Sequence, residues 1–234
     1  MHAVLLGGFG SNRRMLQPTK VSFEAHTGIE MDIIPFRAHM NDEGQVDTLR
    51  RQAHDALWIS HSAGALALQR VYARPIAMIS YAAPIPTSKR HLVKESLGIT
   101  HEHLVGALTD RPGLRANHRR FLANAALEDT VFGIGNLRHL GAIAAYDSLA
   151  TATAAREAGL PVIMNWTAQD RYFQPSTAQL NQAAQQGVII DRDTNGTLMP
   201  GIHNELLVNP DYLFNAPGFQ FAIQAIKANE ASQL

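Results

Sequence analysis

Cysteine is absent from this 234-residue chain, which excludes disulfides, a thiolate zinc site and a cysteine nucleophile. An excess of one charge is absent as well, because 20 basic and 20 acidic side chains give a formal net charge of zero. This balance argues against binding to nucleic acid or to an anionic membrane as the main activity. A chain without cysteine suits a reducing compartment, so we expect a cytoplasmic protein.

Long apolar runs and targeting signals are also missing. No stretch reaches the roughly 18 uninterrupted apolar residues of a membrane-spanning helix, and residues 1–8 lack the basic region and cleavage site of a signal peptide. No phosphate-binding loop occurs, since the glycines at 7–10 are too closely spaced for a dinucleotide-binding motif. We therefore expect neither a membrane span nor a cofactor.

What the chain does contain is an alternation of short apolar runs with helical patterns. In the first half, strands are expected at 2–6, 30–35, 56–60 and 75–81, and helices at 46–56 and 63–72. In the second half, helices are expected at 137–158, 175–186 and 219–229, and strands at 161–166 and 187–191. Strands separated by helices are typical of βαβ units. The pattern predicts an α/β fold with a mostly parallel sheet, and we treat residues 1–234 as a single domain.

Residues 87–135 interrupt this alternation. They contain no strand pattern before Val131 but two helical patterns, at 91–108 and 114–127. Between positions 86 and 120, seven Lys or Arg stand against three Asp or Glu, so the segment has a basic tilt. This composition predicts a helical cap inserted within the domain. A solvated pair of helices, whose charge serves only solubility, is the alternative.

The most informative segment is Leu-Trp-Ile-Ser-His-Ser-Ala-Gly-Ala-Leu at 57–66. An apolar strand runs into Ser62, and small residues stand two positions before and after it, at Ser60 and Gly64. A tight strand-to-helix turn needs such small residues, and it holds one side chain out at the top of the sheet. The helix that follows points its free N–H groups at the same place, which suits a nucleophilic serine. A serine that merely caps the helix is the alternative.

This segment resembles the nucleophile turn of the α/β-hydrolase superfamily, with Ser60 in place of the usual first glycine. The run Leu-Gly-Gly-Phe-Gly-Ser at 6–11 is similar to the family's oxyanion loop, with Gly7 in place of the usual histidine. The resemblance implies that the backbone N–H groups of Phe9 and Ala63 form the oxyanion hole. It also implies a compact sheet of about six strands, without the first two antiparallel strands of larger members.

A serine hydroxyl needs a base to remove its proton and a carboxylate to orient that base, and in this family they follow in the order serine, acid, histidine. The run Pro-Val-Ile-Met-Asn-Trp-Thr-Ala-Gln-Asp at 161–170 looks like the family's late strand and acidic loop, without its usual glycine. The likeness gives Asp170 as the acid. The run Gly-Ile-His-Asn-Glu-Leu at 201–206 resembles the Gly-x-His-x-Glu-Leu stretch of the lysophospholipase and monoacylglycerol lipase branch. This second likeness gives His203 as the base.

Other carboxylates fit the role of the acid less well. Asp147 falls inside an expected helix, while Asp191 and Asp193 stand beside Arg192 in an expected turn, where carboxylates are ordinarily solvated. Asp170 therefore remains the preferred acid.

Other histidines have weaker cases. His61 precedes the nucleophile on a sharp turn, so we expect it to point away and either to pack or to form a local hydrogen bond. His101 and His103 form a His-x-His pair that could bind a metal ion. No third ligand stands at a persuasive spacing, so we expect no metal.

Substrate selection is expected to rest on the cap and the loops. The candidates for the walls of an apolar acyl pocket are Gly8, Gly10, Met40, Tyr81, Ile85, Trp166, Tyr172 and Phe173. The basic side chains that could meet an anionic group are Arg13, Arg14, Lys89, Arg90 and Lys94.

Together these residues predict a serine hydrolase that cleaves a small-molecule carboxylic ester through an acyl-enzyme. A thioesterase or amidase that uses the same Ser62, His203 and Asp170 is one alternative, because a shared fold does not choose among these reactions. A non-catalytic ligand-binding protein on the same fold is another. A capped, apolar hydrolase could also form a homo-oligomer, although the sequence identifies no interface.

Overall fold

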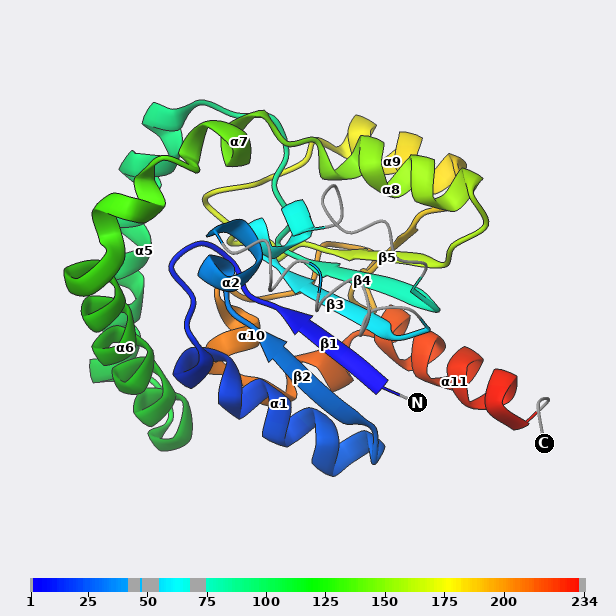
Figure 1. Cartoon of the computed structure of the whole chain (residues 1–234), viewed down its shortest axis with the longest axis horizontal. Helices are drawn as coiled ribbons and strands as arrows, with labels where there is room; N and C mark the ends of the chain where they lie inside the picture. Colours follow the sequence, from blue (N-terminus) through cyan, green and yellow to red (C-terminus); the bar gives the residue numbers. More distant parts are fainter. Residues whose placement is uncertain (1, 42–46, 48–54, 68–74, 232–234) are drawn as a thin grey trace.

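The computed structural model describes residues 2–41, 47, 55–67 and 75–231. At its centre lies a six-stranded sheet with the order β2-β1-β3-β4-β5-β6, in which every neighbouring pair is parallel (Figure 1). The strands are β1 (His2–Leu6), β2 (Glu30–Ile34), β3 (Leu57–His61), β4 (Ala77–Tyr81), β5 (Val162–Asn165) and β6 (Ile189–Ile190). The parallel sheet and its strands are therefore confirmed.

Helices connect the strands. The described helices are α1 (Arg13–Thr27), α2 (Phe36–Asn41), the 3₁₀ helix η1 (Ser62–Leu66), α5 (Lys89–Thr109), α6 (Pro112–Leu137), α7 (Leu140–Ala145), α8 (Ser148–Glu157), α9 (Thr177–Gln185), α10 (Glu205–Val208), the 3₁₀ helix η2 (Pro210–Asn215) and α11 (Pro217–Ala231). At the start of α9, the side chains of Ser176 and Gln179 form a capping box, which fixes where the expected helix begins.

Both faces of the sheet are buried, because successive strand side chains point to opposite sides. Val4 and Leu6 of β1 belong to the core that includes side chains of α8 and α9. Ala3 and Leu5 belong to the core on the other face, with side chains of α1, η2 and α11. Figure 1 shows α8 and α9 on one side of the sheet, with α1 and α11 on the other. This double cover explains why the strands read as continuous apolar runs.

The segment expected as an insert forms a helical hairpin of α5 and α6. The hairpin lies beside the carboxyl ends of the strands (Figure 1). The strand pattern expected from Val131 is wrong, because α6 continues without a break from Pro112 to Leu137. A short apolar run fits a strand and a helix equally well, so periodicity alone could not separate them.

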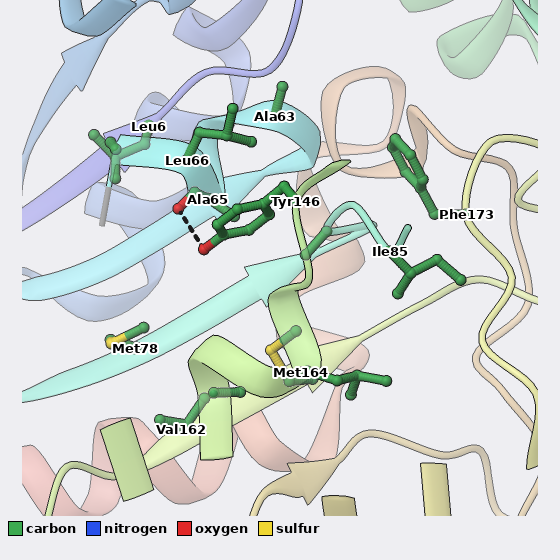
Figure 2. Close-up of a cluster of buried hydrophobic side chains, with 14 of the residues drawn as sticks. Leu6, Ala63, Ala65, Leu66, Met78, Ile85, Tyr146, Val162, Met164 and Phe173 are labelled. Carbon is green, nitrogen blue, oxygen red and sulfur yellow. Dashed lines mark hydrogen bonds between the residues drawn. The ribbon is translucent and has the colours of Figure 1, made fainter. Parts of the chain in front are cut away.

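The single helix expected at 137–158 is also wrong. The chain forms α7 and α8 instead, with an extended backbone at Tyr146 between them. Tyr146 turns into the core, where its hydroxyl donates a hydrogen bond of 3.0 Å to the carbonyl of Ala65 in η1 (Figure 2). The next residue, Asp147, is the N-cap of α8 and accepts a hydrogen bond from the Ala150 N–H. The alanine-rich sequence hides this break.

Two expected helices lie partly outside the described residues. Of the helix expected at 46–56, only positions 47, 55 and 56 are described, and of the one at 63–72, only η1 and Ala67. Within the described part of the chain, no helix combines the length and the hydropathy that crossing a bilayer requires.

Candidate active site

Ser62 stands where β3 ends and η1 begins, at the carboxyl edge of the sheet. Its backbone has φ of 51°, a left-handed conformation that is strained for a residue with a side chain. Such strain is characteristic of a sharp strand-to-helix turn that exposes one side chain to reaction. The turn therefore has the backbone geometry that the sequence predicts.

Glycine at position 64 lets this turn pass close to the neighbouring strand. A Cβ atom built there would lie 2.3 Å from the carbonyl oxygen of Leu6, the last residue of β1. Since that neighbour is backbone, a side chain at 64 has no room. Two positions before the nucleophile, the hydroxyl of Ser60 is 2.8 Å from that of Ser80 on β4. Small residues on both sides of Ser62 thus have identifiable structural reasons.

The glycine loop after β1 packs directly against the serine. A Cβ atom at Gly8 would lie 2.7 Å from the Cβ of Ser62 and 2.8 Å from the carbonyl oxygen of His61. The next residue, Phe9, is half-buried, and its ring makes an edge contact with Phe36 at 5.4 Å between centroids. This approach brings the backbone of the loop to the side of the candidate nucleophile.

Asp170 lies in the loop after β5 and is completely buried. Its Oδ1 accepts hydrogen bonds from the backbone N–H groups of Tyr172, at 2.8 Å, and Phe173, at 3.0 Å. A carboxylate buried without partners would be costly, so these bonds help to hold its charge in the interior. The other oxygen, Oδ2, is left to face His203.

His203 lies in the loop before α10, in the Gly-x-His-x-Glu run. Gly201 has φ of 130°, and a Cβ atom there would lie 2.7 Å from the Cγ of Glu205. The Glu205 carboxylate folds back and accepts a hydrogen bond from the Ile202 N–H at 3.2 Å. The glycine and the glutamate of this motif therefore shape the loop that carries His203.

These three loops bring Ser62, His203 and Asp170 together. The Ser62 hydroxyl is 2.9 Å from Nε2 of His203, and Nδ1 of the same ring is 2.9 Å from Oδ2 of Asp170. In this arrangement Nδ1–H donates to the carboxylate, and Nε2 accepts from the hydroxyl. Ser62 is 6% exposed and His203 is 5% exposed, so the hydrogen bonds form largely out of contact with water. The arrangement can move a proton from oxygen to nitrogen.

A second histidine, His61, supports the base. Its Nε2 is 3.1 Å from the carbonyl oxygen of His203, and the two rings are 5.4 Å apart. His61 packs in the interior, at 2% exposure, but its hydrogen bond is not local, because this partner lies 142 positions away. Burial, reinforced by the nearby His203, lowers the pKa of His61 to about 3. His61 therefore stays neutral and acts as a donor to the histidine loop.

Another contact missed by sequence reasoning reaches the same loop from the hairpin. Nδ2 of Asn204 donates to Nε2 of the fully buried His103 at 3.2 Å. The His103 ring stacks on Phe121 of α6. Burial, with smaller effects from His118 and His203, lowers the pKa of His103 to about 3. The only signal in the sequence was that Asn204 is next to His203.

The competing carboxylates serve other purposes. Asp147 caps a helix rather than lying inside one. Asp191 is not solvated but buried, and it accepts hydrogen bonds from the Gly218 N–H and the Asn165 side chain. Burial raises the pKa of Asp191. Asp193 is half-buried in its turn and accepts hydrogen bonds from two backbone N–H groups, which help to lower its pKa.

Among the aromatic pocket candidates, Tyr172 and Phe173 contact the ring of His203, while Gly8 packs against Ser62. The two aromatic ring centroids lie 4.6 Å and 5.7 Å from that of His203. Ile85 and Trp166 belong to the core cluster that includes side chains of α8 and α9, and the half-buried Met40 packs against it. Trp166 also donates a hydrogen bond to the Ala83 carbonyl. Tyr81 contacts Tyr212 in the core on the opposite face of the sheet. Gly10 has φ of 72° in the loop after Phe9.

The basic side chains proposed for an anionic group are exposed on two helices. Arg13 and Arg14 lie on α1, while Lys89, Arg90 and Lys94 lie on α5. His101 is exposed and His103 is buried, and the described residues contain no group of three side chains that could hold a metal ion.

Comparisons with known proteins give structural likenesses only. No family model matches the chain, and no curated protein matches its sequence. A carboxylesterase of the thaumarchaeon Nitrososphaera gargenis has a TM-score of 0.60 at 13% identity, over 97% of this chain and 91% of that one. An α/β-hydrolase of a Paenibacillus species has a TM-score of 0.52 at 14% identity, over 97% and 98%. The thioesterase domain of the curacin biosynthetic pathway has a TM-score of 0.52 at 13% identity, over 96% and 91%.

These likenesses span nearly the whole chain. Together with the parallel sheet and its strand order, they show that the protein has the α/β-hydrolase fold. At such low identity they establish the fold alone, and the chemistry has to be argued from the site.

Proposed function

We propose that this protein is a serine hydrolase that cleaves carboxylic esters through an acyl-enzyme. The observation that carries the proposal is the hydrogen-bonded relay from Ser62 through His203 to Asp170, with 2.9 Å at each step. The strained backbone of the serine adds support, because such strain accumulates at reactive positions. A serine that only capped a helix would need neither feature.

In the first half-reaction, the Ser62 oxygen attacks the ester carbonyl carbon while Nε2 of His203 takes the hydroxyl proton. Asp170 keeps the ring in the tautomer with its proton on Nδ1 and stabilises the imidazolium that forms. The carbonyl oxygen becomes an oxyanion, which we assign to the backbone N–H groups of Phe9 and Ala63. Collapse breaks the bond to the leaving alcohol, and the alkoxide takes the proton from His203.

In the second half-reaction, water replaces the alcohol. His203 removes a proton from the water, whose oxygen attacks the acyl carbon. The second tetrahedral intermediate then releases a carboxylic acid, and Ser62 recovers its proton from the imidazolium. Ester and water are consumed, alcohol and acid are produced, and no redox partner is required.

Labelling with a fluorophosphonate probe tests this proposal, because such a probe reacts with an activated serine. We expect the parent protein to be labelled at one site and to hydrolyse p-nitrophenyl acetate. Ser62→Ala should lose the labelling and at least about 1,000-fold in kcat. Ser60→Ala, which removes a neighbouring hydroxyl at the end of β3, is the matched control.

Full turnover by Ser62→Ala would overturn the mechanism. Labelling of the parent without turnover of any ester in a panel of graded chain lengths would instead favour a ligand-binding protein on this fold.

A thioesterase is the second candidate, and the likeness to the thioesterase domain described above favours it. The same relay would cleave an acyl thioester, with a thiolate as leaving group in place of the alkoxide. Comparing kcat/KM for matched oxygen esters and thioesters on the same enzyme separates the two reactions.

A further inference from the structure

The residue that follows the candidate acid makes an ion pair with the hairpin. Nε of Arg171 is 2.8 Å from Oε2 of Glu95 on α5, and its NH1 nitrogen is 3.3 Å from Oε1 of Glu102. The Glu95 side chain is only 7% exposed, whereas that of Arg171 is 43% exposed. Glu95 is therefore nearly buried, and its cationic partners are Arg171 at 2.8 Å and the exposed Lys94 at 3.6 Å.

A glycine on α5 leaves room for the guanidinium of Arg171 against the helix. A Cβ atom built at Gly98 would lie 2.7 Å from the Cζ of Arg171, so the guanidinium lies against the bare helix backbone. Positions 95, 98 and 102 are spaced by three and four residues, which places them on one face of the helix. We call Glu95, Gly98 and Glu102 the arginine seat.

Three further hydrogen bonds hold the same loop to α5. Nε2 of His91 lies 3.0 Å from the carbonyl oxygen of Arg171 and 3.2 Å from that of Tyr172. The Tyr172 hydroxyl donates to the hydroxyl of Ser96 at 2.9 Å. The loop is therefore attached to the helix by both its side chains and its backbone.

This loop segment is also the one that holds the relay. The Tyr172 and Phe173 N–H groups bond to one oxygen of Asp170, and the Tyr172 and His203 rings make a T-shaped contact. Any shift of the loop relative to α5 would therefore move the carboxylate and the contact with the imidazole together.

We propose that Arg171, held in the arginine seat, is a positioning residue that couples the α5–α6 hairpin to the Ser62–His203–Asp170 relay. The inference rests on the proposed function for its kinetic readout. Arg171 touches none of the reacting atoms and acts only through the loop that it anchors. Its role is to keep the Asp170 carboxylate and the Tyr172 ring correctly placed relative to the His203 ring.

Arg171→Ala tests the coupling. We expect kcat for p-nitrophenyl acetate to fall about 10- to 100-fold, because small displacements of catalytic groups have effects of this size. KM should change little, since no contact to the substrate is removed. Guanidinium chloride, well below denaturing concentrations, should restore part of the lost kcat by occupying the vacated seat, whereas sodium chloride should not. Arg119→Ala, which alters an exposed arginine on α6, is the matched control.

Gly98→Ala approaches the seat from the helix side. The added methyl would displace the flexible end of Arg171, while alanine favours the helix itself. We expect kcat to fall as in Arg171→Ala without a lower melting temperature, and the double variant to be no slower than Arg171→Ala alone. If kcat fell only because the protein had become less stable, Gly98→Ala would show a lower melting temperature together with its lower kcat.

The low-field proton resonance of His203 Nδ1–H gives a readout that needs no activity. It should be sharp in the parent and in Ser62→Ala, and broadened or lost in Arg171→Ala. An unchanged resonance together with an unchanged kcat would overturn the proposal. If the parent proves inactive but the resonance still depends on Arg171, the proposed function fails and the positioning role stands.

Discussion

At the scale of single residues, the candidate site combines a strained serine with a buried carboxylate. Ser62 holds a left-handed backbone, and Asp170 is completely shielded from water. Each is unfavourable alone and persists because neighbours hold it in place: Gly8 packs against the serine, and two N–H groups bond to the aspartate. Preorganised groups of this kind need little rearrangement during reaction.

Asp170→Asn should therefore remove most activity without unfolding the protein. An amide can donate to Nδ1 of His203 and so favour the wrong tautomer, which leaves Nε2 unable to accept the serine proton. We expect kcat to fall about 1,000- to 10,000-fold, as measured by p-nitrophenyl acetate hydrolysis. Asp193→Asn, at a half-buried carboxylate in a turn outside the relay, should retain the parent rate. Comparable losses in both variants would show that Asp170 has no special role.

At the scale of elements, the nucleophile turn is supported from a distant part of the chain. Tyr146, between α7 and α8, bonds to the carbonyl of Ala65 within η1 (Figure 2). The hydroxyl is a second donor to this buried carbonyl just after the nucleophile, beside the N–H of Ala67. The break between the two helices is thus the feature that delivers a hydroxyl to the turn.

Tyr146→Phe tests this support. Removing the hydroxyl leaves the Ala65 carbonyl without this donor, so we expect a loss of about 1–2 kcal/mol in the free energy of unfolding. Urea denaturation measures the change, and Tyr172→Phe, whose hydroxyl bonds to Ser96 at a half-buried position, should lose less. Equal losses would mean that burial of the acceptor does not matter.

Much of the fold was readable because its elements carry local signals. Each strand is a short apolar run. Ser62 stands between small residues, and at Gly64 a small residue is required because the backbone of Leu6 comes close. The helix break at Tyr146 was not readable, because its cause is a hydrogen bond to a residue 81 positions away. The continuation of α6 through Val131 was missed because short apolar runs are ambiguous.

Some residues of the candidate site could likewise be predicted from the sequence, and others could not. Ser62 and the loop around His203 have recognisable neighbours in the sequence, and in the structure the His203 ring lies between Ser62 and Asp170. The seat of Arg171 had no signal, since it depends on how a helix of the hairpin packs against a loop more than 60 residues later. Tertiary contacts of this kind leave no periodic trace in a single sequence.

At the scale of the whole molecule, two buried neutral histidines make stability depend on pH. Both His61 and His103 have a pKa of about 3 when folded and 6.5 as the ordinary value. Above pH 6.5 the two histidines are neutral in both the folded and the unfolded protein, so they contribute nothing to the pH dependence of stability. Below 6.5 the unfolded chain binds protons that the folded protein excludes, so stability falls until the pH nears 3.

We expect this loss to be about 1.4 kcal/mol per pH unit for each histidine in that window. Urea denaturation at several values between pH 6.5 and 4 measures the slope. His103→Gln, which keeps an acceptor for Asn204 but does not titrate, should make the slope shallower. His101→Gln, at an exposed position of α5, should leave it as in the parent. Identical slopes for all three proteins would contradict the assignment.

The bond between Ser62 and His203 joins residues 141 positions apart, and it has a consequence for synthesis of the chain. The nucleophile and four of the six strands are translated in the first 81 residues, yet the base follows the last strand. A polypeptide still growing on the ribosome therefore carries the serine long before anything can activate it. Under the proposed function, the nascent protein has no hydrolase activity until the segment that carries His203 has been translated.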